Sequence, residues 1–162
     1  MERDELEEIY KTYYYPVYLY ALSLCQNIQE AEELTSDTFY KALLSLEYGN
    51  EQIQYWLLRV CKNSFLDRMR KKKKALSHLR DLSGITAYDH VLDRIIKDEE
   101  TKRLYLAILS LPVQYREIIY MYYFLGYSGK EIAGLSGLSP GAVKTALCRA
   151  RTKLRHCLGE DG

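Results

Sequence analysis

The sequence predicts an all-α protein with two small helical domains joined by a flexible linker. Apolar residues recur at the spacing of an amphipathic helix through most of the 162 residues. Residues typical of helix caps stand at the ends of these periodic segments. The periodicity weakens between residues 76 and 98, so we expect one domain at 1–75, a linker at 76–98 and a second domain at 99–162.

The N-terminal domain is expected to contain three helices. The first spans residues 4 to about 25, and Pro16 should kink or restart it because proline lacks the N–H that a helix interior requires. Asn27 is a favourable N-cap for the second helix, which should run to about residue 46. The third should run from about residue 51 into a run of lysines. Three helices of this length can bury one core, so this domain resembles a small helical bundle.

The linker and the start of the second domain follow. Residues 76–98 mix Ser, Gly, Thr and scattered acids, and we expect a linker with one short helix there. Helices should then span residues 99–111 and 112–124, with Pro112 separating them. Five of the nine glycines fall between residues 126 and 141, which indicates a tight turn between two further short helices.

The caps within this glycine-rich segment predict a helix-turn-helix. Ser128 and Glu131 form a capping box, Ser136 and Gly137 supply the turn, and Ser139 caps a last helix that has proline at its first position. An inward row on the last helix should comprise Val143, Leu147, Ala150 and Leu154. The outward face then carries Lys144, Thr145, Cys148, Arg149 and Arg151. Such a helix fits the major groove of DNA, although an ordinary amphipathic hairpin is the alternative.

Charge is segregated along a chain whose formal net charge is only +1. Residues 59–74 hold eight Lys and Arg against one acid, Asp67, and residues 140–156 hold five Lys and Arg and no acid. Residues 30–37, in contrast, hold four acids and no base. A solvated helix face would explain either basic block alone. The pair indicates two contacts with a polyanion and acidic surface left for another partner.

Several classes of function lack support in the sequence. No apolar stretch approaches the roughly 18 residues that span a bilayer, and the acidic N-terminus does not resemble a signal peptide, so we expect a cytoplasmic protein without membrane insertion. The four cysteines have no C-x-x-C spacing and are expected to be small buried thiols. The three histidines lack metal spacing, and we find no phosphate-binding loop or nucleophile motif. We therefore expect no enzyme, cofactor or metal.

Three segments, in this order along the sequence, resemble a known family. Residues 31–42 and residues 56–70, followed by lysines, resemble the polymerase-binding helix and the -10 recognition helix of extracytoplasmic-function (ECF, group IV) sigma factors. Residues 109–154, from Leu-Ser-Leu-Pro to the last basic helix, resemble their promoter-binding C-terminal domain. The resemblance implies a sigma factor of the sigma-70 family, with a sigma2-like and a sigma4-like domain. Such a protein directs bacterial RNA polymerase to specific promoters.

The resemblance also implies partners. They are the RNA polymerase core, through the clamp helices of its largest subunit and the flap of its second large subunit, promoter DNA, and an anti-sigma factor. An exposed stripe of Glu33, Asp37, Tyr40 and Leu44 offers charge and apolar surface to the polymerase, whereas a solvated acidic face is the alternative.

The DNA contacts implied by the resemblance lie on two helices. Asn63 would lie near a base captured from the -10 element, and the cations along the same helix would contact phosphates: Arg59, Lys62, Arg70, Lys71, Lys72, Lys73 and Lys74. Trp56, at the start of that helix, is expected to pack in the core rather than stack on a base. Contacts to the -35 element would come from Lys130, Lys144, Thr145, Cys148, Arg149 and Arg151.

Two other functions remain open from the sequence. The first is a helix-turn-helix regulator whose N-terminal helices dimerise or bind a ligand, and the second is a helical protein-binding adaptor. The basic block at 59–74 has no purpose in a dimerisation domain, and an adaptor leaves both basic blocks unexplained.

Overall fold

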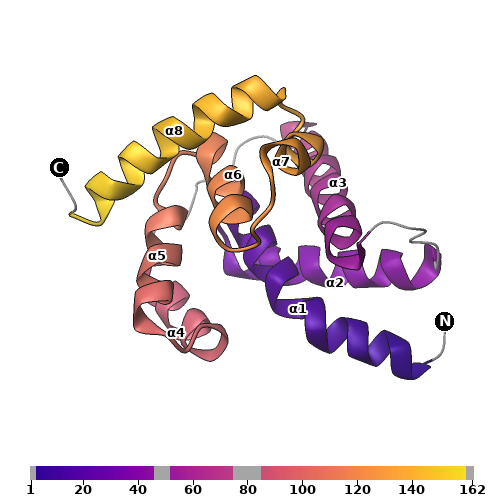
Figure 1. The fold of residues 1–162 in the computed structure, drawn as a ribbon. Helices are drawn as coiled ribbons and strands as arrows, with labels where there is room; N and C mark the ends of the chain where they lie inside the picture. The colour runs from indigo at the N-terminus through magenta and orange to yellow at the C-terminus, as the bar shows by residue number, and fades with distance from the viewer. Residues whose placement is uncertain (1–2, 46–51, 75–84, 160–162) are drawn as a thin grey trace. The chain divides into compact units, whose positions relative to one another are not determined.

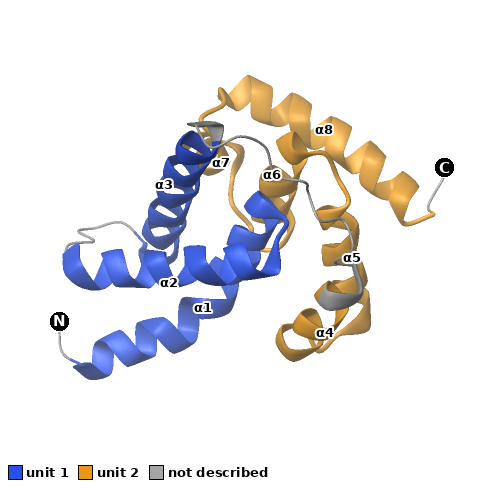
Figure 2. Ribbon diagram, turned by 180° about the vertical axis from the view of Figure 1, so that it is seen from behind, with its two compact units in different colours: residues 1–84 blue, residues 85–162 orange. Residues whose placement is uncertain are grey.

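A computed structural model describes residues 3–45, 52–74 and 85–159 of the chain. Within these residues it contains eight α-helices and no strand, which confirms the predicted all-α fold (Figure 1). The chain divides into two compact units, residues 1–84 and 85–162, which are coloured separately in Figure 2. Each unit has its own buried core, so each is described in turn.

The first unit is a bundle of three helices that all contact one another: α1 (Arg3–Cys25), α2 (Ile28–Ser45) and α3 (Ile53–Lys74). Its core combines residues 17–22 and Leu24 of α1 with Ala31 and Leu34 of α2 and Leu57, Leu58 and Cys61 of α3. The helix α1 continues through Pro16, so the restart that proline suggested does not occur.

The junction between α1 and α2 follows the predicted capping. The amide of Gln26, at a positive φ of 54°, donates to the carbonyl of Leu22 at 2.8 Å and ends α1. The side chain of Asn27 then accepts from the amide of Glu30 at 2.8 Å and starts α2. Because only Gln26 and Asn27 separate the two helices, α1 and α2 form a tight helical hairpin.

The second unit begins with a helix inside the segment expected as linker. Helix α4 (Ile85–Ile95) is the short helix predicted there, and it contacts α5 (Glu99–Leu109). Lys102 of α5 is only 8% exposed, and its ammonium group bonds to Asp93 and, at 3.0 Å, to Asp89 of α4. The hydrogen bonds to Asp93 and Asp89 raise the pKa of Lys102 above its usual value. A buried ammonium needs such partners, so this cluster ties α4 to the second unit.

The rest of the second unit confirms the predicted helix-turn-helix. Helix α6 (Val113–Tyr123) precedes α7 (Gly129–Ser136) and α8 (Pro140–Cys157). Ser128 and Glu131 form the capping box, and the Ser139 hydroxyl accepts from the amide of Ala142 at 3.1 Å. The inward row of α8, Val143, Leu147, Ala150 and Leu154, is buried as predicted.

The cysteines do not all follow the sequence expectation. Cys61 is buried and Cys25 is partly buried, but Cys148 and Cys157 are exposed on α8. The expectation of buried thiols is wrong for these two, because Cys148 lies opposite the inward row of α8 and Cys157 is the last residue of the helix, beyond that row. Burial raises the pKa of the Cys25 thiol to about 12. No helix among the described ranges is long and apolar enough to cross a membrane.

The turn between α7 and α8 depends on Gly137, whose φ of +81° lies in the left-handed region. We expect Gly137→Ala to lower the free energy of unfolding by about 1–2 kcal/mol, because a Cβ disfavours this conformation. Gly141→Ala is the matched control: it lies in α8, its Cβ would also meet open space, and alanine is the better helix former. Urea unfolding of the full chain measures the free energy of unfolding of both variants. Equal changes in the two would contradict the role given to the left-handed conformation of Gly137.

Candidate functional site

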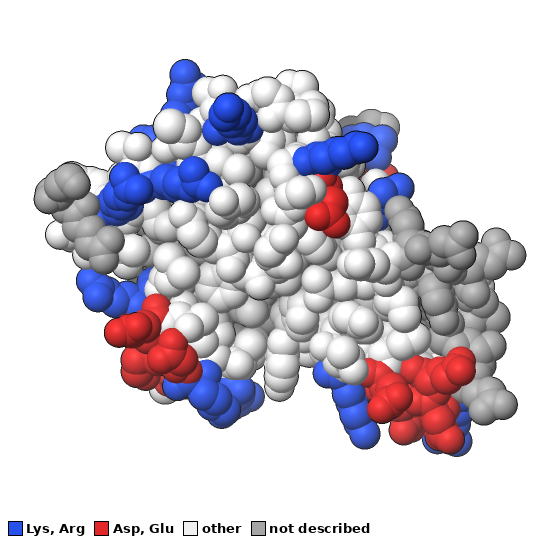
Figure 3. All heavy atoms as spheres, viewed as in Figure 1, with Lys and Arg blue, Asp and Glu red and all other residues white. Residues whose placement is uncertain are grey.

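The outward face of α8 is the clearest candidate for contact with DNA. Lys144, Thr145, Cys148 and Arg149 are all exposed, as predicted, and the Thr145 hydroxyl donates to the carbonyl of Gly141 at 3.2 Å. Lys130, on α7, is exposed as well. Figure 3 shows Lys and Arg side chains over α8, whereas acidic side chains gather over α4 and near the N-terminal end of α1. The described part of α8 therefore offers a cationic surface without acids.

Arg151 is placed differently from the other predicted contacts of α8. Its guanidinium group lies 4.8 Å from the centre of the Tyr122 ring, and its Nε donates to the Tyr123 hydroxyl at 3.2 Å. The hydrogen bond to Tyr123 raises the pKa of Arg151 above its usual value. Arg151 is half-buried, so the structure does not bring it together with the exposed row of α8.

The predicted -10 contacts on α3 are mostly exposed. Arg59, Asn63, Arg70 and Lys71 face solvent, and Lys62 is partly buried. The Arg59 guanidinium lies 5.3 Å from the centre of the Tyr55 ring, and Arg70 bonds to Asp67 at 2.7 Å. The side chains of Lys73 and Lys74 lie outside the described part of the chain.

A set of ion pairs joins α3 to α2, and we name it the α2–α3 ladder. Arg68 bonds to Glu33 at 2.8 Å and to Asp37 at 2.7 Å, and Lys72 bonds to Glu30 at 2.7 Å. The hydrogen bond to Asp37 is the main cause that raises the pKa of Arg68 above its usual value. Of the predicted -10 cations, Lys72 is engaged with Glu30 of the ladder, and Arg70 is paired with Asp67 on its own helix.

The predicted polymerase-binding stripe divides into two parts. Glu33 and Asp37 belong to the ladder, although about half of each side chain remains exposed. Tyr40 and Leu44, one turn and two turns further along α2, are 63% and 65% exposed. Exposed aromatic and aliphatic side chains of this size are typical of surfaces that bind other proteins.

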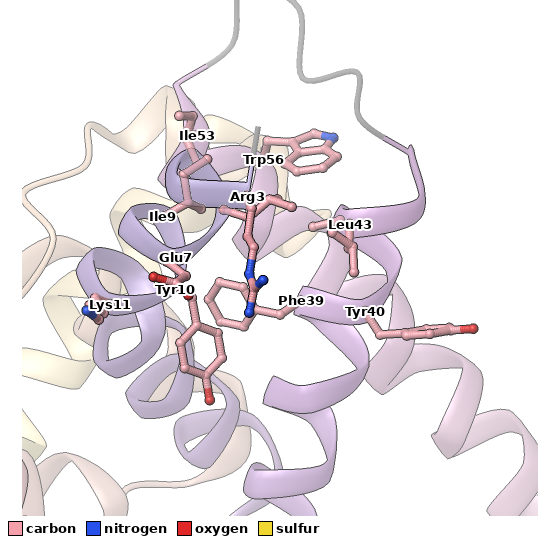
Figure 4. A pocket seen from close by; sticks show the side chains of 12 residues that line it. Arg3, Glu7, Ile9, Tyr10, Lys11, Phe39, Tyr40, Leu43, Ile53 and Trp56 are labelled. Carbon is pink, nitrogen blue, oxygen red and sulfur yellow. The ribbon is translucent and has the colours of Figure 1, made fainter. Parts of the chain in front are cut away.

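An apolar cleft lies beside this stripe and was not predicted. It has a volume of about 560 Å³ and is lined by residues of α1, α2 and the start of α3. Figure 4 shows Phe39, Leu43, Ile53 and Trp56 around it, with Tyr40 extending away from the others. Trp56 thus lines a surface cleft rather than a sealed core. Periodicity could not reveal the cleft because it forms only where three helix ends meet.

Metal chemistry finds no support in the described ranges, where no group of three or more His, Cys, Asp and Glu side chains could hold an ion. The arrangement instead offers a cationic recognition helix, a second cationic helix, and a partly apolar and partly acidic face on α2. Surfaces of these two kinds are typical of proteins that bind DNA and other proteins.

Comparison with known proteins assigns the chain to a family. Residues 9–75 match Sigma-70 region 2 and residues 101–154 match Sigma-70, region 4. The ECF RNA polymerase sigma factor SigM of Bacillus subtilis is 31% identical over 152 residues, which cover 93% of each chain. The ECF sigma factor SigW of the same organism is 27% identical over 169 residues, covering 97% of this chain and 90% of the relative.

Two solved structures share the fold. The sigma factor RpoE of Bartonella quintana, solved in complex with the anti-sigma factor NepR, superposes with a TM-score of 0.73 at 20% identity over 98% of this chain and 99% of that one. CnrH, solved in complex with the cytosolic domain of CnrY, superposes with a TM-score of 0.61 at 21% identity. The match covers 99% of this chain and 92% of that one. Region 2, region 4 and full-length relatives all agree with the motifs found in the sequence: the chain belongs to the extracytoplasmic-function family of RNA polymerase sigma factors, which are transcription initiation factors rather than enzymes.

Proposed function

We propose that this sigma factor divides promoter recognition between α3 and α8 and binds the RNA polymerase core through α2. The observation that carries the proposal is that each unit exposes one cationic helix: Arg59, Asn63, Arg70 and Lys71 on α3, and Lys144 and Arg149 on α8. Two DNA-binding surfaces on one chain suit a promoter with two separated elements, here the -10 and -35 elements. A regulator with a dimerisation domain has no use for the α3 cations.

The face of α2 is the proposed docking surface for the largest polymerase subunit. Its half-exposed carboxylates can steer a basic partner, and the exposed Tyr40 and Leu44 can be buried on contact. The proposal places the clamp helices here and assigns the flap of the second large subunit to the second unit. Asp37 would have to serve this partner while it also bonds to Arg68.

An anti-sigma factor is the proposed regulator. The solved relative RpoE was crystallised with the anti-sigma factor NepR, and its fold spans nearly the whole of this chain. A protein that covers the α2 face or the cationic helices would block initiation directly. Action inside the cell, away from the membrane, agrees with the absence of a membrane-spanning helix in the described residues, and we propose a cytoplasmic location.

Reconstituted transcription tests the function as a whole. Purified chain and RNA polymerase core from the source organism are incubated with fragments of the source genome. We expect the chain to bind core and to yield transcripts that start at a small set of promoters. Core that produces the same transcripts with and without the chain would refute the proposal.

Charge reversal at Asp37 tests the polymerase face. We expect Asp37→Arg to weaken the affinity for core about tenfold or more, the effect of losing one charge-assisted contact. Because this variant also breaks the bond to Arg68, the control is the charge swap that combines Asp37→Arg with Arg68→Asp and restores a pair within the chain. The swap should remain defective in core binding. Recovery of core affinity by the swap would show that Asp37 acts only through the ladder.

Arg149 is the proposed base contact of α8, because it is exposed on the outward face. We expect Arg149→Ala to weaken the binding free energy of the holoenzyme by about 1–3 kcal/mol on a promoter with an intact -35 element. On a promoter whose -35 element is scrambled, the binding free energy should hardly change. Lys153→Ala, another exposed cation of α8, should weaken both DNAs alike. Fluorescence anisotropy measures the affinity for each DNA. An equal loss of affinity for both DNAs with Arg149→Ala would show that Arg149 contacts phosphate rather than a base.

A further inference from the structure

The structure separates Arg151 from the exposed cations of α8, although all lie on one helix. We propose that Arg151 is a positioning residue for -35 recognition: its contact with Tyr122 and Tyr123 of α6 sets the rotation of α8 about its own axis. The inference rests on the proposed role of α8 in reading the -35 element. It changes the sequence expectation that Arg151 itself binds DNA.

The guanidinium group of Arg151 makes two kinds of contact with α6, one to a ring and one to a hydroxyl. Its central carbon, Cζ, lies over the Tyr122 ring at 4.8 Å from the ring centre, while Nε donates to the hydroxyl oxygen of Tyr123 at 3.2 Å. The two rings contact each other edge to face, with centres 5.1 Å apart and an angle of 81° between their planes. A flat cation held by one ring face and one hydroxyl cannot turn without losing a contact.

Helix α8 needs such a lateral contact because its inward row is narrow. The row Val143, Leu147, Ala150 and Leu154 packs aliphatic side chains along one line of the helix, and Ala150 is the smallest of them. Apolar contacts are not directional, so a lateral contact of defined geometry adds to what this row contributes against rolling of the helix. Arg151 directly follows Ala150 and meets α6 on the flank of the helix, where a contact opposes rolling most effectively.

A small roll would disturb base recognition. Side chains reach about 5–6 Å from a helix axis, so a roll of about 10° moves a side-chain tip by about 1 Å. Recognition of guanine by arginine needs two aligned hydrogen bonds at once, and such a shift breaks their geometry. Contacts with phosphates depend mainly on charge and tolerate the same shift. The proposed role therefore concerns sequence preference rather than general affinity for DNA.

The experiment compares variants of the tyrosines with variants of the arginine in holoenzyme reconstituted from the full chain and core. The probes are a promoter fragment selected from random DNA by the wild-type holoenzyme and the same fragment with its -35 element scrambled. The variants are Arg151→Gln, Tyr122→Leu and Tyr123→Phe. Tyr122→Phe keeps the ring and serves as the conservative variant, and Lys153→Gln serves as the control for a lost phosphate contact.

We expect Arg151→Gln and Tyr122→Leu to lower the preference for the intact over the scrambled -35 element by about tenfold, the size of one lost base contact. Tyr123→Phe should lower it less, since only the hydrogen bond is lost. Tyr122→Phe should behave as wild type. The slope of log affinity against log salt should stay unchanged for all four variants, whereas Lys153→Gln should reduce it by about 0.9.

The opposite pattern would overturn the inference. If Arg151→Gln reduces the salt slope by about 0.9 and weakens both DNAs equally, while Tyr122→Leu keeps the full preference, Arg151 is a phosphate contact. Thermal unfolding of each variant verifies that the second unit is folded at the assay temperature. Failure of the proposed function gives a different result, because the wild-type holoenzyme itself would then bind the intact and scrambled elements equally well.

Discussion

Each unit must hold a strongly cationic helix against its core by one narrow face, and the remaining arrangement follows from that constraint. Helix α3 buries Leu57, Leu58 and Cys61, and α8 buries a single aliphatic row. Both carry several Lys and Arg side chains on the rest of their surface, where like charges repel one another. Additional contacts lie beside the apolar face in both units, and their chemistry differs.

In the first unit the additional contacts are ionic. Helices α2 and α3 run antiparallel. Glu30, near the start of α2, pairs with Lys72 near the end of α3, whereas Lys41, later in α2, donates to Ser64, earlier in α3, at 2.8 Å. This direction places Glu30, Glu33 and Asp37 of α2 against two of the α3 cations. The basic block is thus only partly available to DNA, and a count of charges in the sequence overstates the potential of the face that remains exposed.

The sequence predicted what depends on neighbours along the chain. Caps such as Asn27 and Ser128, the turn at Gly137 and the inward row of α8 are local, and all are present in the structure. Contacts between helices were not predicted. The pairing of Arg68 with Asp37 depends on the antiparallel packing of α2 and α3. The contact of Arg151 with Tyr123 depends on the packing of α6 beside α8. Helical periodicity identifies an outward flank but does not say which neighbour meets it.

The two kinds of support have different consequences for function. Ion pairs exposed to solvent contribute little and weaken with salt, and their carboxylates lie on the same face that is proposed to meet the polymerase. The α2–α3 ladder can therefore rearrange when a partner binds, while the apolar packing of α2 on α3 remains. The tyrosines that hold α8 carry no charge, so salt and a charged partner affect them less. The base contacts proposed for α8 benefit from a fixed support, whereas the contacts with the -10 element proposed for α3 tolerate a support that can rearrange.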